Sequence, residues 1–350
     1  MRALQITTWH QEAEFVERDE PTPSAGQVVV RIGASGACHS DLHMMHGKGD
    51  AVPFSLPFTL GHENAGWVHS VGDGVKSVVP GQAVAVYGAW GCGFCARCIV
   101  GMENYCEGSG TPNVGAGCGL GRDGGMADYM LVPDPRYLVP LPDGLSPAQA
   151  APLTDAGLTP YHAVRRSSQK LGPGSTAVVL GIGGLGHLAV QILKATSATR
   201  VIAVDTRSDA LDLALSVGAD IVIEGGDSAA RDVRAATGNR GADLVLDCVG
   251  TEETLASAAA CTRSLGDLTL IGVAGGALEF SFLRPAYEVS VQSVYWGSRT
   301  ELVEVLELAS QGLIRAEATI YPLGQALYAY RALAAGEIVG RAVMVPEKSS

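Results

Sequence analysis

Two different patterns of apolar and polar positions divide the chain. Over roughly the first 150 residues, short apolar and β-branched runs alternate with turns that contain glycine and proline. Examples of such runs are residues 28–32, 65–71 and 82–87, the last one directly preceded by the turn Pro80-Gly81. Short runs bounded by turn residues predict β-strands, so we expect a mainly antiparallel β domain here.

From about residue 156 the pattern changes to apolar runs separated by helical patterns. The predicted strands are residues 175–180, 200–204, 221–223, 242–247, 268–273 and 289–295. The predicted helices between them are residues 185–196, 209–217, 229–237 and 253–262. Strands that alternate with helices predict βαβ units and a parallel sheet, and therefore an α/β fold. The tail adds helices over 299–311 and 324–335 and a strand over 342–345.

The charge balance excludes several classes of function. The 24 Lys and Arg residues are outnumbered by 36 Asp and Glu residues, and no basic block occurs, so nucleic acid and anionic membranes are poor partners. Apolar runs fall short of the ~18 residues that a membrane span needs. The start of the chain lacks the apolar core of a secretory signal, so we expect a cytoplasmic protein. Charged residues form 17% of the chain against ~25% on average, which favours a homodimer or homotetramer.

A glycine-rich turn follows the first strand of the α/β region. The turn reads Gly181-Ile182-Gly183-Gly184-Leu185-Gly186 and opens a helix, as in the Rossmann-type fingerprint for dinucleotides. Asp205 ends the next predicted strand, where a carboxylate accepts hydrogen bonds from the adenosine ribose and repels a 2′-phosphate. We therefore expect NAD as the cofactor, although Arg207 weakens this preference and Asp205 could simply cap the following helix.

Four of the eight cysteines are clustered. Cys92, Cys95, Cys98 and Cys106 have a spacing that brings four thiolates to one tetrahedral zinc, a closed shell typical of a structural site. An iron–sulfur cluster also uses cysteine runs, but the final Cys-Pro of the bacterial ferredoxin pattern is missing.

Cys38, His62 and Asp155 are three further candidate ligands. They lie far apart in the sequence, and none of them indicates a metal site by itself. Around one of them, the motif Gly61-His62-Glu63-x2-Gly66-x5-Gly72-x2-Val75 resembles the zinc signature of the medium-chain alcohol dehydrogenases. The cysteine lobe and the glycine-rich turn also resemble those of this family, in the same order along the chain. The segment from Pro152 to His162 is similar to that of bacterial NAD-dependent secondary-alcohol dehydrogenases.

The resemblance implies a domain arrangement and two zinc ions per chain, one catalytic and one structural. A GroES-like catalytic domain would comprise residues 1–155 and 297–350, with the structural lobe at about 91–107, and a Rossmann NAD-binding domain residues 156–296. The implied catalytic ligands are Cys38, His62 and Asp155, although many family members have cysteine at the third position. Three protein ligands leave one position for substrate.

Other roles are implied residue by residue. Glu63 resembles a carboxylate that exchanges with a ligand or supports one, and Asp41 would orient His62. Ser40 would take the alcohol proton and pass it to His43, while His39 would contact the cofactor phosphates or join this relay. The further cofactor contacts implied are Thr159, Val249, Val273 and Arg341, the last one at the pyrophosphate.

A set of apolar residues completes the expected site. The candidates that would line a broad substrate pocket are Phe54, Leu120, Tyr295 and Trp296. The sequence thus predicts a zinc- and NAD-dependent alcohol dehydrogenase for secondary or aryl alcohols and the matching ketones or aldehydes. The alternatives are a polyol dehydrogenase of the same superfamily, which would need a polar pocket, and a non-catalytic NAD-binding protein on the same fold.

Overall fold

The computed structural model describes residues 1–46, 54–109 and 117–347. Backbone contacts divide the chain into two units. The first comprises Met1–Ala156, Trp296–Ser310 and Ala318–Ser350, and the second comprises Gly157–Tyr295 and Gln311–Glu317. Residues 311–317, which the sequence placed in the first domain, thus contact the second unit instead.

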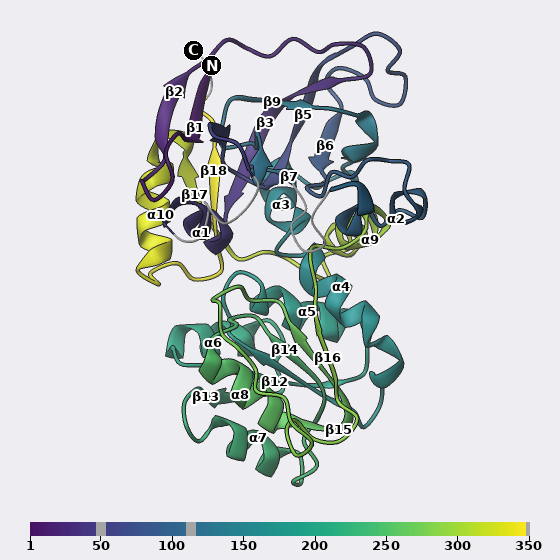
Figure 1. The fold of residues 1–350 in the computed structure, drawn as a ribbon, viewed down its shortest axis with the longest axis vertical. Helices are drawn as coiled ribbons and strands as arrows, with labels where there is room; N and C mark the ends of the chain where they lie inside the picture. Colours follow the sequence, from purple (N-terminus) through teal and green to yellow (C-terminus); the bar gives the residue numbers. More distant parts are fainter. Residues whose placement is uncertain (47–53, 110–116, 348–350) are drawn as a thin grey trace. The chain divides into compact units, whose positions relative to one another are not determined.

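The first unit contains a seven-stranded sheet with the order β10-β6-β5-β3-β18-β17, in which β9 also pairs with β3 (Figure 1). The strands are β3 (Val28–Ala37), β5 (Glu63–Val71), β6 (Ala83–Val86), β9 (Tyr129–Val132), β10 (Leu138–Pro140), β17 (Ala318–Pro322) and β18 (Arg341–Val345). Only β17 and β18 pair in parallel; the other described pairs are antiparallel. The predicted β-rich domain is therefore present. The sequence did not predict β17, whose side chains are mostly exposed and lack an apolar face.

Smaller elements complete the first unit. A second sheet has the order β2-β1-β4, and two short strands pair in parallel. Their bounds are β1 (Arg2–Ile6), β2 (Glu14–Glu17), β4 (Phe58–Thr59), β7 (Gly117–Cys118) and β8 (Gly121–Arg122). The helices are α1 (His39–His46), α2 (Ala96–Ile99), α3 (Pro147–Ala150), α9 (Arg299–Ser310) and α10 (Ala326–Ala334). An apolar cluster with Leu4, Phe58 and Leu333 joins β1, β4 and α10. At ~1.5–3 kcal/mol for each large side chain buried, this cluster fixes the helix against the sheet.

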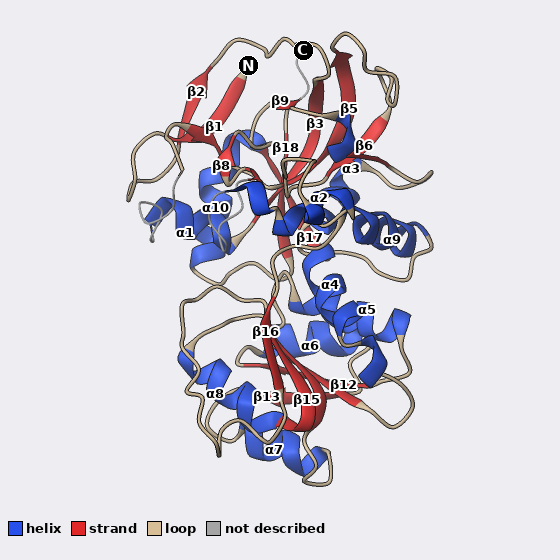
Figure 2. Ribbon diagram, turned by 45° about the vertical axis from the view of Figure 1, so that its right-hand side comes forward, coloured by secondary structure: helices blue, strands red, loops and turns tan. Residues whose placement is uncertain are grey.

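The second unit is built on a six-stranded sheet in which every described neighbour pair is parallel. Its order is β13-β12-β11-β14-β15-β16, and Figure 2 shows helices beside it. The strands are β11 (Thr176–Leu180), β12 (Arg200–Asp205), β13 (Ile221–Glu224), β14 (Ala242–Asp247), β15 (Thr262–Leu270) and β16 (Ser290–Ser293). The helices are α4 (Leu158–Arg166), α5 (Gly186–Thr196), α6 (Ser208–Ser216), α7 (Ala229–Ala236) and α8 (Glu252–Cys261). The Rossmann-type prediction is confirmed.

Two strands of this unit differ from the sequence prediction by several residues. Strand β15 covers Thr262–Leu270 instead of the expected 268–273; just after its end the chain passes close to Val249, whose backbone atoms would lie 2.2 Å from a Cβ added at Gly272. Strand β16 covers only Ser290–Ser293 of the expected 289–295. Four helices of the described chain were not predicted. Helices α2 and α3 are only four residues long, α1 begins with polar residues, and α4 carries Pro160 near its start, which is unusual inside a helical pattern.

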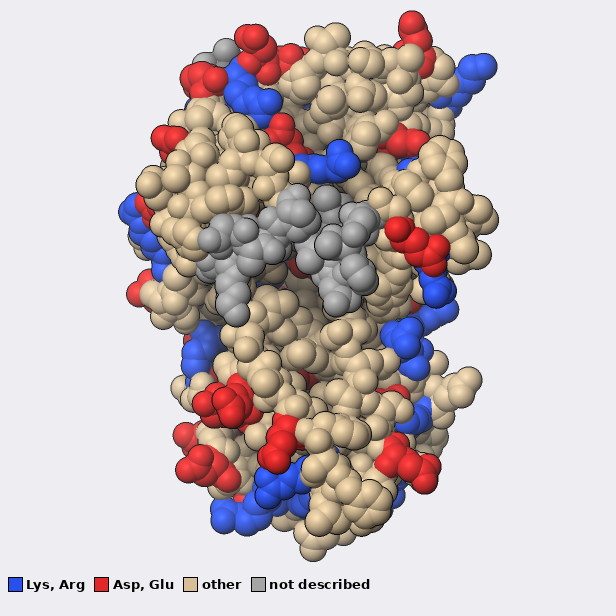
Figure 3. Space-filling view, in the orientation of Figure 1, with Lys and Arg blue, Asp and Glu red and all other residues tan. Residues whose placement is uncertain are grey.

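Charges of both signs are interspersed on the face drawn in Figure 3. No helix among the described residues is long and apolar enough to cross a membrane.

Candidate active site

Two paired strands bring the first metal-binding residues together. Strands β3 and β5 pair antiparallel with Gly36 opposite Glu63, so Cys38, just after β3, lies near His62, just before β5. The turn before β5 uses Gly61 at φ +92°, in the left-handed region that glycine adopts without strain. Asp155 follows the short 3₁₀ turn Ala151–Thr154 and completes the group.

The three side chains have the geometry of one metal site. The ligand atoms of Cys38, His62 and Asp155 all lie within 4.8 Å of one another, and His62 Nε2 lies 3.3 Å from Asp155 Oδ2. Ligands at ~2.0–2.3 Å from a tetrahedral zinc are separated by ~3.3–3.8 Å, so the donor set fits this ion. One thiolate, one imidazole and one carboxylate leave a fourth position for a substrate oxygen.

Asp41 sets the tautomer of His62. Its carboxylate Oδ1 lies 3.1 Å from His62 Nδ1, and both side chains are fully buried. A proton on Nδ1 leaves the lone pair of Nε2 for a cation. Burial lowers the pKa of His62, but the Asp41 carboxylate and bonds to Asp155 and Cys38 hold it well above its ordinary value. A cation bound at Nε2 would displace the second proton of the ring.

Sequence reasoning missed a partner of this carboxylate. Tyr330 on α10 donates its hydroxyl hydrogen to Asp41 Oδ2 at 2.8 Å, and the amide of Cys38 donates to the same oxygen at 3.0 Å. Burial raises the pKa of Tyr330 well above its ordinary value, so the hydroxyl stays a donor. Tyr330 lies 289 residues from Asp41 along the chain, and no local pattern indicated this contact.

Glu63 and Arg341 form a buried ion pair beside the metal ligands. Glu63 Oε1 is ion-paired with the Arg341 guanidinium and accepts a hydrogen bond from the amide of Ala156, next to Asp155, at 3.0 Å. Burial raises the pKa of the Glu63 carboxyl to about 7, against the lowering effect of Arg341. Arg341, which the resemblance placed at the pyrophosphate, is 3% exposed and ion-paired with Glu63.

The relay candidates share the short helix α1. Ser40 Oγ lies 3.7 Å from Cys38 Sγ, which places this hydroxyl at the metal site. His43 is partly buried, and burial lowers its pKa, while His39 is exposed at the start of the helix. The helix therefore brings Ser40 and Asp41 to the metal ligands, and it carries both histidines of the predicted relay.

Four cysteine sulfur atoms form a second cluster, in a lobe that includes α2. The sulfurs of Cys92, Cys95, Cys98 and Cys106 lie within 4.8 Å of one another, with 4.0 Å between Cys92 and Cys98. Sulfurs at ~2.3 Å from a tetrahedral zinc would be ~3.8 Å apart. Backbone amides of Cys98 and Glu107 lower the pKa of the Cys95 thiol to about 6, which favours the thiolate that zinc binds.

The glycine-rich turn lies in the second unit, where the strand order reverses between β11 and β14. Gly181 has φ +84°, and an added Cβ would lie 2.4 Å from Val249 of the neighbouring strand end. At Gly186, an added Cβ would lie 1.9 Å from the carbonyl oxygen of Gly181, so helix and turn approach closely. Gly183 faces open space. Ligands of such sheets bind where the strand order reverses, and the turn has the shape for a pyrophosphate.

The remaining cofactor candidates surround this turn or lie elsewhere in the same unit. Asp205 accepts from the amide of Ile182 at 2.7 Å and from that of Arg207 at 2.9 Å, and the Arg207 guanidinium lies 3.8 Å away. The charge of Arg207 thus partly offsets that of Asp205. Gly184 and Leu185 complete the turn; Thr159 is buried in α4, and Val273 is 58% exposed beyond β15.

The predicted pocket residues are divided between the units. Trp296, at φ +50° and 3% exposed, meets His62 edge to face with ring centroids 6.0 Å apart. Its ring occupies space beside Gly88 and Gly117, where an added Cβ would clash with it. Phe54 packs edge-on against Phe58, Leu120 is partly buried between β7 and β8, and Tyr295 belongs to the second unit. The structure therefore brings one predicted pocket residue, Trp296, into contact with a metal ligand.

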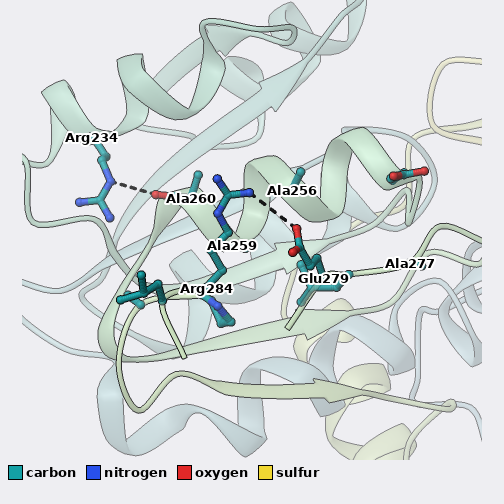
Figure 4. A pocket seen from close by; sticks show the side chains of 12 residues that line it. Arg234, Ala256, Ala259, Ala260, Ala277, Glu279 and Arg284 are labelled. Atoms are coloured by element: carbon teal, nitrogen blue, oxygen red, sulfur yellow. Dashed lines mark hydrogen bonds and ion pairs between the residues drawn. The ribbon is translucent and has the colours of Figure 1, made fainter. Parts of the chain in front are cut away.

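A separate hollow of about 600 Å³ lies in the second unit (Figure 4). Its wall is formed by alanines of α8, which include Ala256 and Ala259, and by the segment from Ala277 to Ala286. Arg284 and Glu279 pair across it at 3.7 Å. It contains none of the metal ligands or glycines of the turn, so it is not the candidate active site.

Comparisons with known proteins agree with this picture. The family model described as "Alcohol dehydrogenase GroES-like domain" matches residues 24–143, and the one described as "Zinc-binding dehydrogenase" matches residues 184–311. An NAD-dependent alcohol dehydrogenase of Sulfurisphaera tokodaii is 36% identical over 99% of this chain and 100% of its own length. A D-arabinose 1-dehydrogenase (NADP(+)) of Saccharolobus solfataricus is 35% identical over 93% of this chain and 92% of its own.

Solved structures show the same relationship. The alcohol dehydrogenase of Aeropyrum pernix has a TM-score of 0.92 and 34% identity, over 99% of this chain and 100% of that one. The acetophenone reductase of Geotrichum candidum, solved with NAD, has a TM-score of 0.85 and 30% identity, over 98% and 96% of the two chains.

Proposed function

The chain belongs to the zinc-binding alcohol dehydrogenases with a GroES-like domain, and from this membership we propose its reaction. It transfers hydride reversibly between NAD and secondary or aryl alcohols, whose products are ketones or aldehydes. The observation that carries the proposal is the cluster of Cys38, His62 and Asp155, in which Asp41 presents the Nε2 lone pair of His62 to a cation. A non-catalytic protein would have no need of this arrangement.

The residues of the site have distinct roles in this reaction. Cys38, His62 and Asp155 would hold a zinc ion, which supplies Lewis acidity when bound, and NAD accepts the hydride. The Ser40 hydroxyl, 3.7 Å from Cys38 Sγ, is placed to accept the proton of the alcohol. His43 takes up that proton through the relay on α1, because its lowered pKa leaves the ring neutral and therefore able to accept a proton.

We propose NAD rather than NADP as the physiological cofactor. Asp205 at the end of β12 would repel a 2′-phosphate and accept bonds from the ribose hydroxyls. The NAD-dependent relatives and the NAD complex of the acetophenone reductase support this choice. Because one relative is named for its use of NADP(+), the role of the Asp205–Arg207 pair in cofactor choice should be tested directly.

The proposed substrates are secondary and aryl alcohols. The indole ring of Trp296 beside His62 offers an apolar surface at the metal site, and a polyol would find few polar partners on this surface. The acetophenone reductase, which is named for an aryl ketone, supports the same substrate class.

We also propose a homodimer or homotetramer that forms through the edge of the parallel sheet. Strand β16 is the last strand of this sheet, and Val291 on it is 42% exposed. Nearby in sequence, the side chains of Phe280, Phe282 and Tyr287 are more than half exposed. An apolar edge is a liability that pairing with a second copy removes. A monomer in light scattering across micromolar concentrations would contradict this assignment.

We also propose a cytoplasmic location, because cysteines that cluster as possible metal ligands, here Cys92, Cys95, Cys98 and Cys106, are typical of proteins in a reducing compartment.

The activity test uses the full chain with zinc and a panel of alcohols. We expect reduced cofactor, read at 340 nm, with NAD and 1-phenylethanol or 2-propanol, and much slower reaction with sorbitol, arabinose or NADP. His62→Gln should abolish the signal. A wild-type protein that contains zinc and binds NAD, yet oxidises no alcohol of the panel, would overturn the proposal. A preference for sorbitol or arabinose would favour the polyol alternative.

A further inference from the structure

Two side chains of α5 form hydrogen bonds with a segment of chain that lies outside the helices and strands. The amide of Arg315 donates to Gln191 Oε1 at 2.9 Å, and Gln191 Nε2 donates back to the carbonyl of Arg315 at 2.9 Å. One turn earlier on the helix, the amide of Glu317 donates to His187 Nε2 at 3.1 Å. His187 and Gln191 thus satisfy backbone groups of residues 311–317, the segment that leads into β17.

The second nitrogen of His187 reaches the glycine-rich turn. His187 Nδ1 lies 2.8 Å from the carbonyl oxygen of Gly183, and the side chain is fully buried. An amide N–H can only donate and a carbonyl oxygen can only accept, so the two contacts fix the ring. Nδ1 carries the hydrogen and Nε2 carries the lone pair, and the ring is neutral.

The contact with Gly183 determines which way a peptide unit of the turn points. The carbonyl of Gly183 accepts from both the side chain and the backbone N–H of His187, the latter at 3.2 Å. A peptide is planar and trans, so its N–H points opposite to its C=O. With the carbonyl of Gly183 held toward α5, the N–H of Gly184 points away from the helix. An outward N–H at a helix N-terminus is a donor for phosphate.

We propose that His187 is a positioning residue for the cofactor: it holds the Gly183–Gly184 peptide in its phosphate-binding orientation and links this peptide to residues 311–317. The inference rests on the proposed use of NAD. A turn held in its binding conformation loses less freedom when the dinucleotide binds, so the bond to Gly183 contributes to affinity. His187 touches neither substrate nor zinc, and the hydride transfer itself does not need it.

Two substitutions separate the two contacts of the ring. In His187→Asn, the amide nitrogen can take the place of Nδ1 and donate to Gly183, while the bond to Glu317 is lost. In His187→Gln, the amide oxygen can take the place of Nε2 and accept from Glu317, while the bond to Gly183 is lost. Gln191→Leu is the matched control, because it releases the same segment from the next turn of the helix.

The readout is the dissociation constant of NADH, measured by its fluorescence on the zinc-loaded full chain. Loss of one buried hydrogen bond should raise this constant roughly two- to tenfold in His187→Gln. His187→Asn and Gln191→Leu should bind as the wild type does. The kcat at saturating NAD should be equal in all four proteins, whereas the KM for NAD should rise in His187→Gln alone.

Two results would overturn this inference. His187→Gln could bind NADH as tightly as the wild type does, or His187→Asn and His187→Gln could be weakened equally. Failure of the wild type itself to bind NADH would instead refute the proposed cofactor. Thermal unfolding of each variant shows whether it is folded. If His187→Asn and His187→Gln are both destabilised, the difference between their dissociation constants for NADH still tests the inference.

Discussion

Replacing Tyr330 by phenylalanine should loosen the catalytic zinc without touching any of its ligands. The change keeps the ring within its apolar cluster and removes the 2.8 Å hydrogen bond to Asp41 Oδ2. A buried hydrogen bond to a charged group contributes ~1.5–3 kcal/mol, so the free energy of unfolding should fall by about that amount. Asp41 then keeps two hydrogen-bond partners, the amide of Cys38 at 3.0 Å and Nδ1 of His62 at 3.1 Å.

The consequence for the metal follows from the role of Asp41. Loss of a partner that directly supports a metal ligand costs ~10–100-fold in affinity, and Tyr330 acts one step further away, so we expect zinc release about tenfold faster. The assay mixes the protein with an excess of a chromogenic chelator and follows the absorbance of its zinc complex. One zinc per chain should leave faster than in the wild type, and the other, held by four cysteines, should leave at the wild-type rate.

Tyr87→Phe is the matched control. Tyr87 is also fully buried, and its hydroxyl donates to the backbone carbonyl of Gly297 at 2.7 Å. Its loss should cost ~0.5–1.5 kcal/mol of stability, because the acceptor is neutral, and should leave zinc release unchanged. If both variants released zinc at the wild-type rate, or equally faster, the link from Tyr330 through Asp41 to His62 would be wrong.

Three further substitutions test other parts of the account. Cys98→Ser removes one of four thiolates from a closed shell and should lower the Tm and the zinc content from two to one per chain; unchanged stability with one zinc in the wild type would mean that the lobe holds no zinc. Asp205→Ala removes the charge opposed to a 2′-phosphate and should narrow the ratio of kcat/KM for NAD over NADP; equal use of both cofactors by the wild type would contradict the role of Asp205. Asp155→Asn should reduce turnover at least tenfold and the zinc content toward one while NADH still binds, as expected for a lost metal ligand. Full activity with two zincs in Asp155→Ala would point to Glu63 as the ligand instead.

The sequence predicted the second unit better than the first. Strands β11 and β14 are buried at every position and contain the apolar runs 177–180 and 244–246, and the helices between the strands have clear apolar periods. Strand β17 and helix α1 lack such a pattern. The polar residues of α1 are set by the metal site that they surround, so local preference gave no indication of a helix there.

The site was predictable where ligands are close in sequence and unpredictable where folding joins distant segments. Spacing alone indicated the four-cysteine lobe, while Cys38, His62 and Asp155 needed the resemblance to a family. The contacts of Tyr330 with Asp41 and of His187 with Glu317 link residues 289 and 130 positions apart. Both depend on tertiary packing, and neither residue stands in a motif that indicates its partner.

The most direct test of the account is a zinc titration of the activity. Protein from which a chelator has removed the more labile zinc is titrated with ZnCl₂, and the NAD-dependent oxidation of 1-phenylethanol is followed at 340 nm. We predict a rate near zero at the start that rises linearly and levels off once each chain has regained one ion at Cys38, His62 and Asp155. Full activity before any zinc is added, or no activity once both sites are filled, would contradict a catalytic zinc at these residues.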